Sequence, residues 1–184
     1  NLTNVEKKFF ESQQIKDQKT SIPYITVKDF PSLGLLTSLR FIEWVYENPH
    51  GVVSLPTGKT PEYFIKWTKK LIDNWDEEKL IKIRNDNGLN QKTKPDFSKL
   101  TFVQIDEFFP INPTQHNSFF NYVNKYYLDN FSFSKENALL INCNEIPLYD
   151  NMTAKEIFLN QKIDLSLRHR DPISFEDNPF NGCK

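Results

Sequence analysis

The stretch GVVSLPTGKTPEYF, residues 51–64, combines a short β-branched run, a tight loop and the start of a helix. Residues 51–55 have the apolar character of a buried strand. Pro61 suits a first helical position, and apolar residues recur at helical spacing from there to Trp75. The stretch therefore predicts a strand, a loop and a helix, which is the unit that builds parallel sheets.

The flanking sequence extends this pattern in both directions. Helices are predicted at residues 5–14, 32–47 and 117–130, a short helix followed by a surface loop at 76–99, and strands at 22–27, 100–105 and 138–142. This order predicts one α/β domain over residues 1–184, a Rossmann-like parallel sheet flanked by helices, with ligands at the carboxyl ends of its strands. Periodic apolar positions become sparse after Pro147, so we expect residues 150–184 to be poorly packed.

Composition excludes several classes of partner. The chain has 184 residues, 38% of them hydrophobic, and its 23 Lys and Arg against 24 Asp and Glu give a net charge of −1. This balance argues against a nucleic-acid or membrane-surface partner. No apolar run approaches the roughly 20 residues of a membrane span and no signal-peptide layout is present, so we expect a cytoplasmic protein. Cys143 and Cys183 lack ligand spacing, so no metal site is predicted.

The loop in the opening stretch has the features of an anion site. Unpaired backbone N–H groups and the positive end of a helix dipole would converge there. Gly58 permits close approach, Lys59 adds a charge, and three hydroxyls are available as donors, on Ser54, Thr57 and Thr60. A nucleotide-binding P-loop is excluded because Val53 stands where that motif requires glycine. The alternative is a capped helix start, with Thr57 or Thr60 as the cap and Lys59 in solvent.

A second candidate follows the strand predicted at residues 100–105. Asp106 and Glu107 would lie at its carboxyl end, where a carboxylate beside a phosphate loop could act as a general base. The alternative is that one of the two caps a turn or pairs with a lysine. His116 lies in the following loop and could line a pocket. The aromatic residues at helical spacing further on are interpreted as core, and they include Phe119, Tyr122 and Tyr126.

Together the segments SLPTGKTPEYF and FVQIDEFFPINPTQHNSFFNYV resemble the glucosamine-6-phosphate isomerase/deaminase family, over residues 52–130. In the phosphate loop Ser54 replaces a usual glycine. The matching loop residues are Leu55, Pro56, Thr57, Gly58, Thr60 and Pro61; the matching residues of the second segment are Asp106, Glu107, Phe108, Ser118 and Phe119.

This resemblance implies the conversion of glucosamine 6-phosphate to fructose 6-phosphate and ammonia, without metal or organic cofactor. Asp106 would be the base that moves a proton between C1 and C2, and backbone N–H groups around Gly58, Lys59 and Thr60 would hold the phosphate. Glu107, His116 and Ser118 would be possible pocket residues. The small-molecule partner is then a sugar phosphate, and we also expect a homo-oligomer.

The sequence departs from the family in one important respect. The family's glycine-rich segment, which carries the ring-opening histidine, has no counterpart, and His169 lacks its context. We therefore expect the chain to correspond to the amino-terminal half of a deaminase-like protein, to be incomplete at its C-terminus, and to show weak or no turnover by itself. Two alternatives remain: a 6-phosphogluconolactonase-like hydrolase, which would release no ammonia, and a non-catalytic sugar-phosphate-binding protein.

Overall fold

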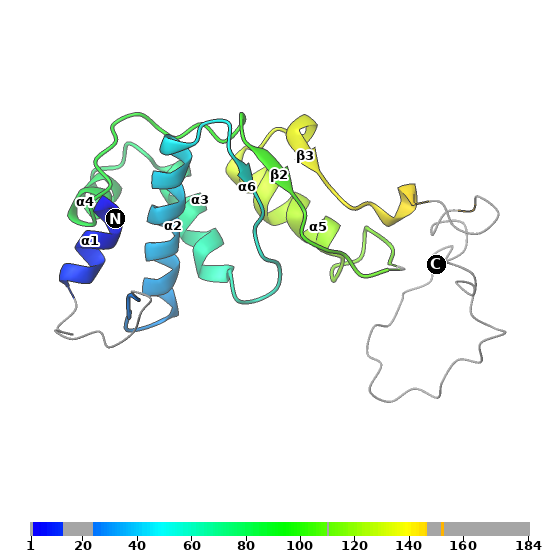
Figure 1. Cartoon of the computed structure of the whole chain (residues 1–184), viewed down its shortest axis with the longest axis horizontal. Coiled ribbons are helices and arrows are strands. Elements are labelled where there is room, and N and C mark those ends of the chain that lie inside the picture. The colour runs from blue at the N-terminus through cyan, green and yellow to red at the C-terminus, as the bar shows by residue number, and fades with distance from the viewer. Residues whose placement is uncertain (1, 13–23, 110, 147–151, 153–184) are drawn as a thin grey trace.

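A computed structural model describes residues 2–12, 24–109, 111–146 and 152 (Figure 1). Its strands are β1 (Val52–Val53), β2 (Thr101–Val103) and β3 (Ala138–Leu139). Its α-helices are α1 (Asn4–Glu11), α2 (Phe30–Glu47), α3 (Glu62–Asp73), α4 (Glu78–Asp86), α5 (Phe119–Val123) and α6 (Asp129–Phe131). A π-helical turn, η1 (Asn124–Leu128), joins α5 to α6, and two 3₁₀ turns, η2 (Lys135–Asn137) and η3 (Cys143–Glu145), flank β3.

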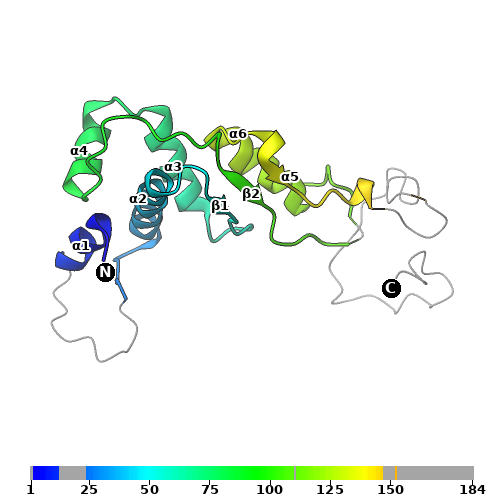
Figure 2. The ribbon, with the colours of Figure 1, turned by 45° about the horizontal axis from the view of Figure 1, so that its top comes forward.

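The three strands form one parallel sheet in the order β1-β2-β3. Val53 pairs with Phe102, and Phe102 with Ala138, so their side chains share one face of the sheet. Both crossovers advance in the same direction, and right-handed connections then place their helices on the same face. Figures 1 and 2 show α5 and α6 alongside β2 and β3. The structure confirms the expected α/β class, a parallel sheet flanked by helices.

Helices α2 and α3 pack closely against each other beside the sheet. Helix α2 begins where the Asp29 side chain accepts a hydrogen bond from the backbone N–H of Ser32, with Pro31 in the first turn. A Cβ added at Gly34 would lie 2.5 Å from the Cβ of Tyr63. Glycine at this position therefore allows the close approach of the two helices.

An aromatic core connects the helix pair to the sheet. Phe131 makes an edge contact with Phe64 of α3, with ring centroids 6.0 Å apart, and Tyr127 packs against Phe102 of β2 at 5.8 Å. Phe102, Tyr127 and Phe131 are all fully buried. Contacts between aromatic rings therefore link α3, the α5–α6 segment and β2.

Most predicted elements are present, with two differences. The strand predicted at residues 22–27 is wrong over 24–27, where no strand forms; residues 22–23 lie outside the description. Ile25 and Val27 pack against the core, so their alternation reflects burial on one side without strand pairing. The helix predicted at 117–130 is interrupted by the π turn η1. Of residues 150–184, only Met152 is described.

Candidate functional site

The edge of the sheet brings the two candidate segments together. Because β1 and β2 are parallel neighbours, the loop after β1 and the residues after β2 leave the same edge of the sheet. The Ser54 hydroxyl donates a hydrogen bond to the carbonyl of Val103, the last residue of β2. This bond joins the start of the candidate phosphate loop to the strand that leads to Asp106.

The loop at residues 54–61 adopts a conformation that requires glycine. Gly58 has φ +94°, and a Cβ placed there would meet nothing within 4 Å. Glycine is therefore needed here for the positive φ of the backbone, and not because a side chain would lack space. Helix α3 has Pro61 as its N-cap residue, and no side chain caps it. Thr57 and Thr60 therefore do not fill the helix-capping role that was the alternative to an anion site.

Several backbone N–H groups of the loop have no hydrogen-bond acceptor among the described residues. Over the chain as described, the backbone N–H groups of Thr57, Gly58, Lys59 and Thr60 donate no hydrogen bond. Lys59 is exposed, and its ammonium group makes no ion pair with any described residue. Such a set of amides at the start of a helix, beside a free cation, can bind an anion.

Two tyrosines hold the loop from the side of the α5–η1 segment. The Tyr122 hydroxyl donates to the carbonyl of Gly58 at 2.7 Å, and the Tyr127 hydroxyl donates to the carbonyl of Pro56. Burial, with smaller effects of Tyr126 and Glu62, raises the pKa of Tyr122 to about 12, so its phenol remains a donor at neutral pH. The sequence pattern predicted Tyr122 as a core residue and did not predict the hydrogen bond of its hydroxyl. The presence of tyrosine in place of phenylalanine could have indicated that the hydroxyl has a partner.

Asp106 and Glu107 have different surroundings. Asp106 is exposed, and its carboxylate accepts no hydrogen bond from the described residues; its backbone carbonyl accepts one from the Gln104 side chain at 2.8 Å. The Glu107 carboxylate accepts hydrogen bonds from the Ser118 hydroxyl at 2.7 Å and from the backbone N–H groups of Phe119 at 3.0 Å and Phe120 at 2.7 Å. Glu107 therefore binds the start of α5, and Asp106 is left free.

Of the remaining candidates, Ser118 lies beside Glu107 and His116 is in solvent. Ser118 is buried, and its hydroxyl caps α5 by accepting from the backbone N–H of Asn121 at 3.3 Å. His116 is exposed in the loop before it. Among the residues that the structure covers, no three His, Cys, Asp or Glu side chains group as a metal ion would require, and no helix is long and apolar enough to cross a membrane.

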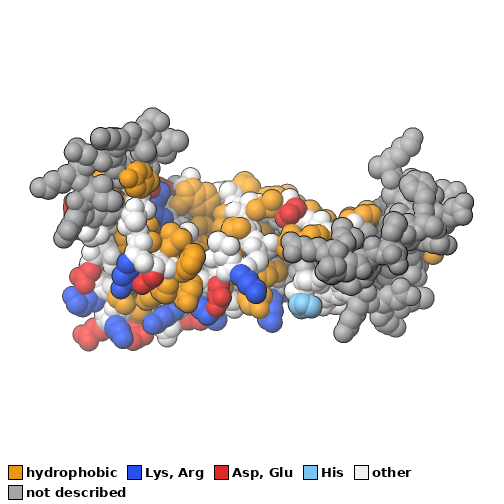
Figure 3. Space-filling view, turned by 90° about the horizontal axis from the view of Figure 1, so that it is seen from below, with side chains coloured by type: hydrophobic (Ala, Val, Ile, Leu, Met, Phe, Trp, Pro, Cys, Tyr) orange, Lys and Arg blue, Asp and Glu red, His pale blue; other side chains and the backbone are white. Residues whose placement is uncertain are grey.

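A groove of about 460 Å³ borders the loop on the side of α2 and α3. Leu55, Pro56 and Thr60 form its wall on the loop side, and aromatic side chains of the two helices complete it. Figure 3 shows hydrophobic side chains gathered over these helices. The groove is suited to apolar groups, in contrast to the exposed amides of the loop beside it.

No protein-family model matches the chain. No curated protein matches it either. Among solved structures, it is similar to a monomeric glucosamine-6-phosphate deaminase described as a missing link of the NagB superfamily, with 19% sequence identity and a TM-score of 0.48. The similarity covers 63% of this chain and 41% of that one, so the chain spans about two fifths of the length of that protein.

Proposed function

We propose that the chain binds a phosphorylated sugar at the carboxyl edge of its sheet and belongs to a deaminase-like enzyme acting on glucosamine 6-phosphate. The observation that carries this proposal is the parallel pairing of β1 with β2, which places the loop at residues 54–61 and Asp106 at the same edge. The hydrogen bond from Ser54 to Val103 supports it by joining the two segments.

The phosphate would bind to the loop. The unpaired N–H groups of Thr57, Gly58, Lys59 and Thr60 are suited to phosphate oxygens, and the Lys59 ammonium group supplies the opposite charge. Phosphate binding at one end of the substrate would orient the carbons at the other end.

Asp106 would act at the far end of the sugar. In the reaction implied by the family resemblance, its carboxylate removes the proton from C2 of the open-chain sugar and returns it to C1. The resulting imine at C2 takes up water and releases ammonia, which leaves fructose 6-phosphate. Two features of Asp106 suit this role: its carboxylate is free, and its backbone is held by Gln104.

A second candidate is a non-catalytic sugar-phosphate-binding protein. The role of Glu107 favours it, because this carboxylate is occupied at the start of α5 and only one carboxylate of the doublet is left free for chemistry. A lactonase-like hydrolase would use the same phosphate loop and would release an acid instead of ammonia.

Binding and turnover of glucosamine 6-phosphate test these candidates. Lys59→Ala combined with Thr60→Ala should weaken binding, measured by calorimetry, by roughly tenfold or more, because charge-assisted hydrogen bonds are lost. Lys79→Ala is the matched control, since Lys79 is exposed on α4. Unchanged affinity in the double variant would overturn the phosphate assignment.

Ammonium release distinguishes the enzyme from the binding protein. In the full-length protein, Asp106→Asn should abolish ammonium release and leave the dissociation constant for the sugar phosphate largely unchanged. Binding without ammonium release in the full-length wild-type protein would favour the non-catalytic candidate. Hydrolysis of a sugar-phosphate lactone, without ammonium release, would favour the lactonase.

A further inference from the structure

The candidate phosphate loop is held from one side by hydroxyls of a single helical segment. Tyr122 lies in α5 and Tyr127 in η1, five residues later, and their hydroxyls bond the carbonyls of Gly58 and Pro56. In a regular α-helix, side chains five residues apart point about 140° away from each other. A π turn brings such residues closer to one side, which explains how both hydroxyls reach the same loop.

The planarity of the peptide bond makes these two contacts directional. In a trans peptide, the carbonyl of one residue and the N–H of the next point in opposite directions. With the carbonyls of Pro56 and Gly58 directed at the tyrosines, the N–H groups of Thr57 and Lys59 point away from them. These are two of the loop amides for which the described chain supplies no acceptor.

We propose that Tyr122 and Tyr127 are positioning residues, which direct the amides of Thr57 and Lys59 toward the phosphate of a bound sugar phosphate. This inference rests on the proposed function of the loop. The tyrosines do not touch the phosphate; they set the orientation of the peptides that do.

The two hydroxyls are themselves held rigidly. The ring of Tyr127 is fully buried between Phe102 at 5.8 Å and Phe131 at 5.7 Å, measured between ring centroids. The ring of Tyr122 packs against that of Tyr126 at 4.6 Å. Rigid placement of the donors means that the loop carbonyls are oriented before any ligand arrives.

The same helical segment also contacts the acidic doublet. Glu107, next to Asp106 in the chain, binds the first backbone N–H groups of α5. Tyr122, at the other end of α5, binds Gly58. Helix α5 therefore connects the proposed base to the proposed phosphate loop and sets the spacing between them.

Tyr122→Phe and Tyr126→Phe form a matched pair that isolates the hydroxyl contact. Both substitutions keep an aromatic ring, but of these two tyrosines only Tyr122 makes a hydroxyl hydrogen bond in the described structure. Tyr122→Phe should weaken the binding of both glucosamine 6-phosphate and inorganic phosphate roughly three- to tenfold, and Tyr126→Phe should leave it unchanged. Tyr127→Phe is a second variant with the same expected direction.

The amide of Lys59 gives a readout that general destabilisation would not change. In the wild-type protein, its ¹H–¹⁵N NMR signal should shift on titration with inorganic phosphate, and in Tyr122→Phe this shift should be reduced while the melting temperature stays close to that of Tyr126→Phe. Equal effects of the Tyr122 and Tyr126 variants would assign the role to ring packing and overturn the inference.

The outcomes separate this inference from the proposed function. If the wild-type protein binds neither phosphate compound, the phosphate loop and this inference both fail. If the wild-type protein binds and the Lys59/Thr60 double variant does not, while Tyr122→Phe and Tyr127→Phe bind normally, only the positioning role fails.

Discussion

Glu107 shows how neighbouring residues of the same type acquire different roles. Asp106 and Glu107 are adjacent acids in the segment that follows β2. Glu107 meets the backbone N–H groups at the start of α5, and Asp106 faces solvent. Carboxylates at a helix N-terminus are stabilised by unpaired amides and by the helix dipole.

Replacing Glu107 by Gln should destabilise the fold. The glutamine amide nitrogen would face a backbone N–H where a carboxylate oxygen now accepts a hydrogen bond, so the free energy of unfolding should fall by about 1–3 kcal/mol. Urea denaturation measures this change. Glu136→Gln, at an exposed position in η2, should change stability by less than about 0.5 kcal/mol. Equal stability of the two variants would contradict the capping role of Glu107.

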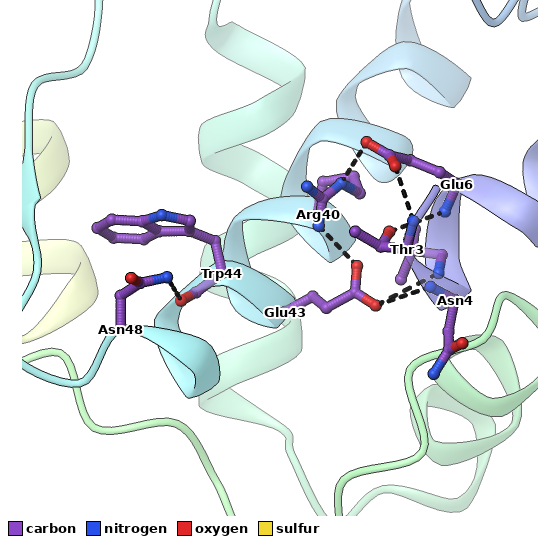
Figure 4. Close-up of polar contacts among 8 residues, drawn as sticks. Thr3, Asn4, Glu6, Arg40, Glu43, Trp44 and Asn48 are labelled. Atoms are coloured by element: carbon purple, nitrogen blue, oxygen red, sulfur yellow. Dashed lines mark hydrogen bonds and ion pairs between the residues drawn. The ribbon is translucent and has the colours of Figure 1, made fainter. Parts of the chain in front are cut away.

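At the scale of elements, α1 is attached to α2 by a polar cluster (Figure 4). Arg40 of α2 donates to Glu6 at 2.9 Å and to Glu43 at 2.7 Å. The buried carboxylate of Glu43 accepts from the backbone N–H of Asn4 at 3.1 Å, while Thr3 and Glu6 cap α1 reciprocally. A short helix is marginal alone, so these contacts explain why α1 forms.

The attachment of α1 should depend on pH through Glu6. Burial alone would raise the pKa of Glu6. The hydrogen bond from the Thr3 amide and the charge of the Arg40 guanidinium have the opposite and larger combined effect, so the pKa lies below its usual value of 4.5. A carboxyl whose pKa is lower in the folded state adds stability above pH 4.5 and loses it as the pH falls through the folded value. Amide hydrogen exchange in α1, corrected for intrinsic rates, should show less protection at pH 3 than at pH 6.

Glu6→Gln provides the control for this pH dependence. The variant should show weaker protection of α1 at pH 6 and a smaller difference between the two pH values, because the titrating group is gone. Amides of α3, which do not contact Glu6, serve as the internal reference. The same pH dependence in the variant would show that another group is responsible.

At the scale of the whole molecule, the described helices cover one face of the sheet and leave the other face uncovered. Val53 and Phe102 are buried on the covered face, whereas Val52 is 65% exposed and Leu139 64% exposed on the other. Parallel sheets are ordinarily covered on both faces. The open apolar face therefore favours association, in line with the homo-oligomer expected from the sequence, which stays a prediction.

The 184-residue chain should accordingly associate as its concentration rises. Val52→Thr combined with Leu139→Thr should reduce this association, measured by sedimentation velocity, because both changes make the open face more polar. Leu33→Thr alters an exposed leucine on α2 and should leave association unchanged. A wild-type chain that remains monomeric at all concentrations would contradict the role of this face.

Apart from the strand predicted at residues 22–27, the sequence by itself determined the order of strands, loops and helices, and it drew attention to the loop at residues 54–61 and to Asp106. These features depend on hydrophobic periodicity and on single residues such as Pro61 and Gly58. Such signals act over a few residues, so local patterns were sufficient to predict the elements and the loop. Only the tertiary structure decided that β2 lies between β1 and β3, that Glu107 caps α5, and that tyrosine hydroxyls hold the loop. The bond from Tyr122 to Gly58 spans 64 positions of the chain. Hydrophobic periodicity indicates which side of an element is buried. Which residue that side contacts, 64 positions away in the chain, depends on how whole elements pack.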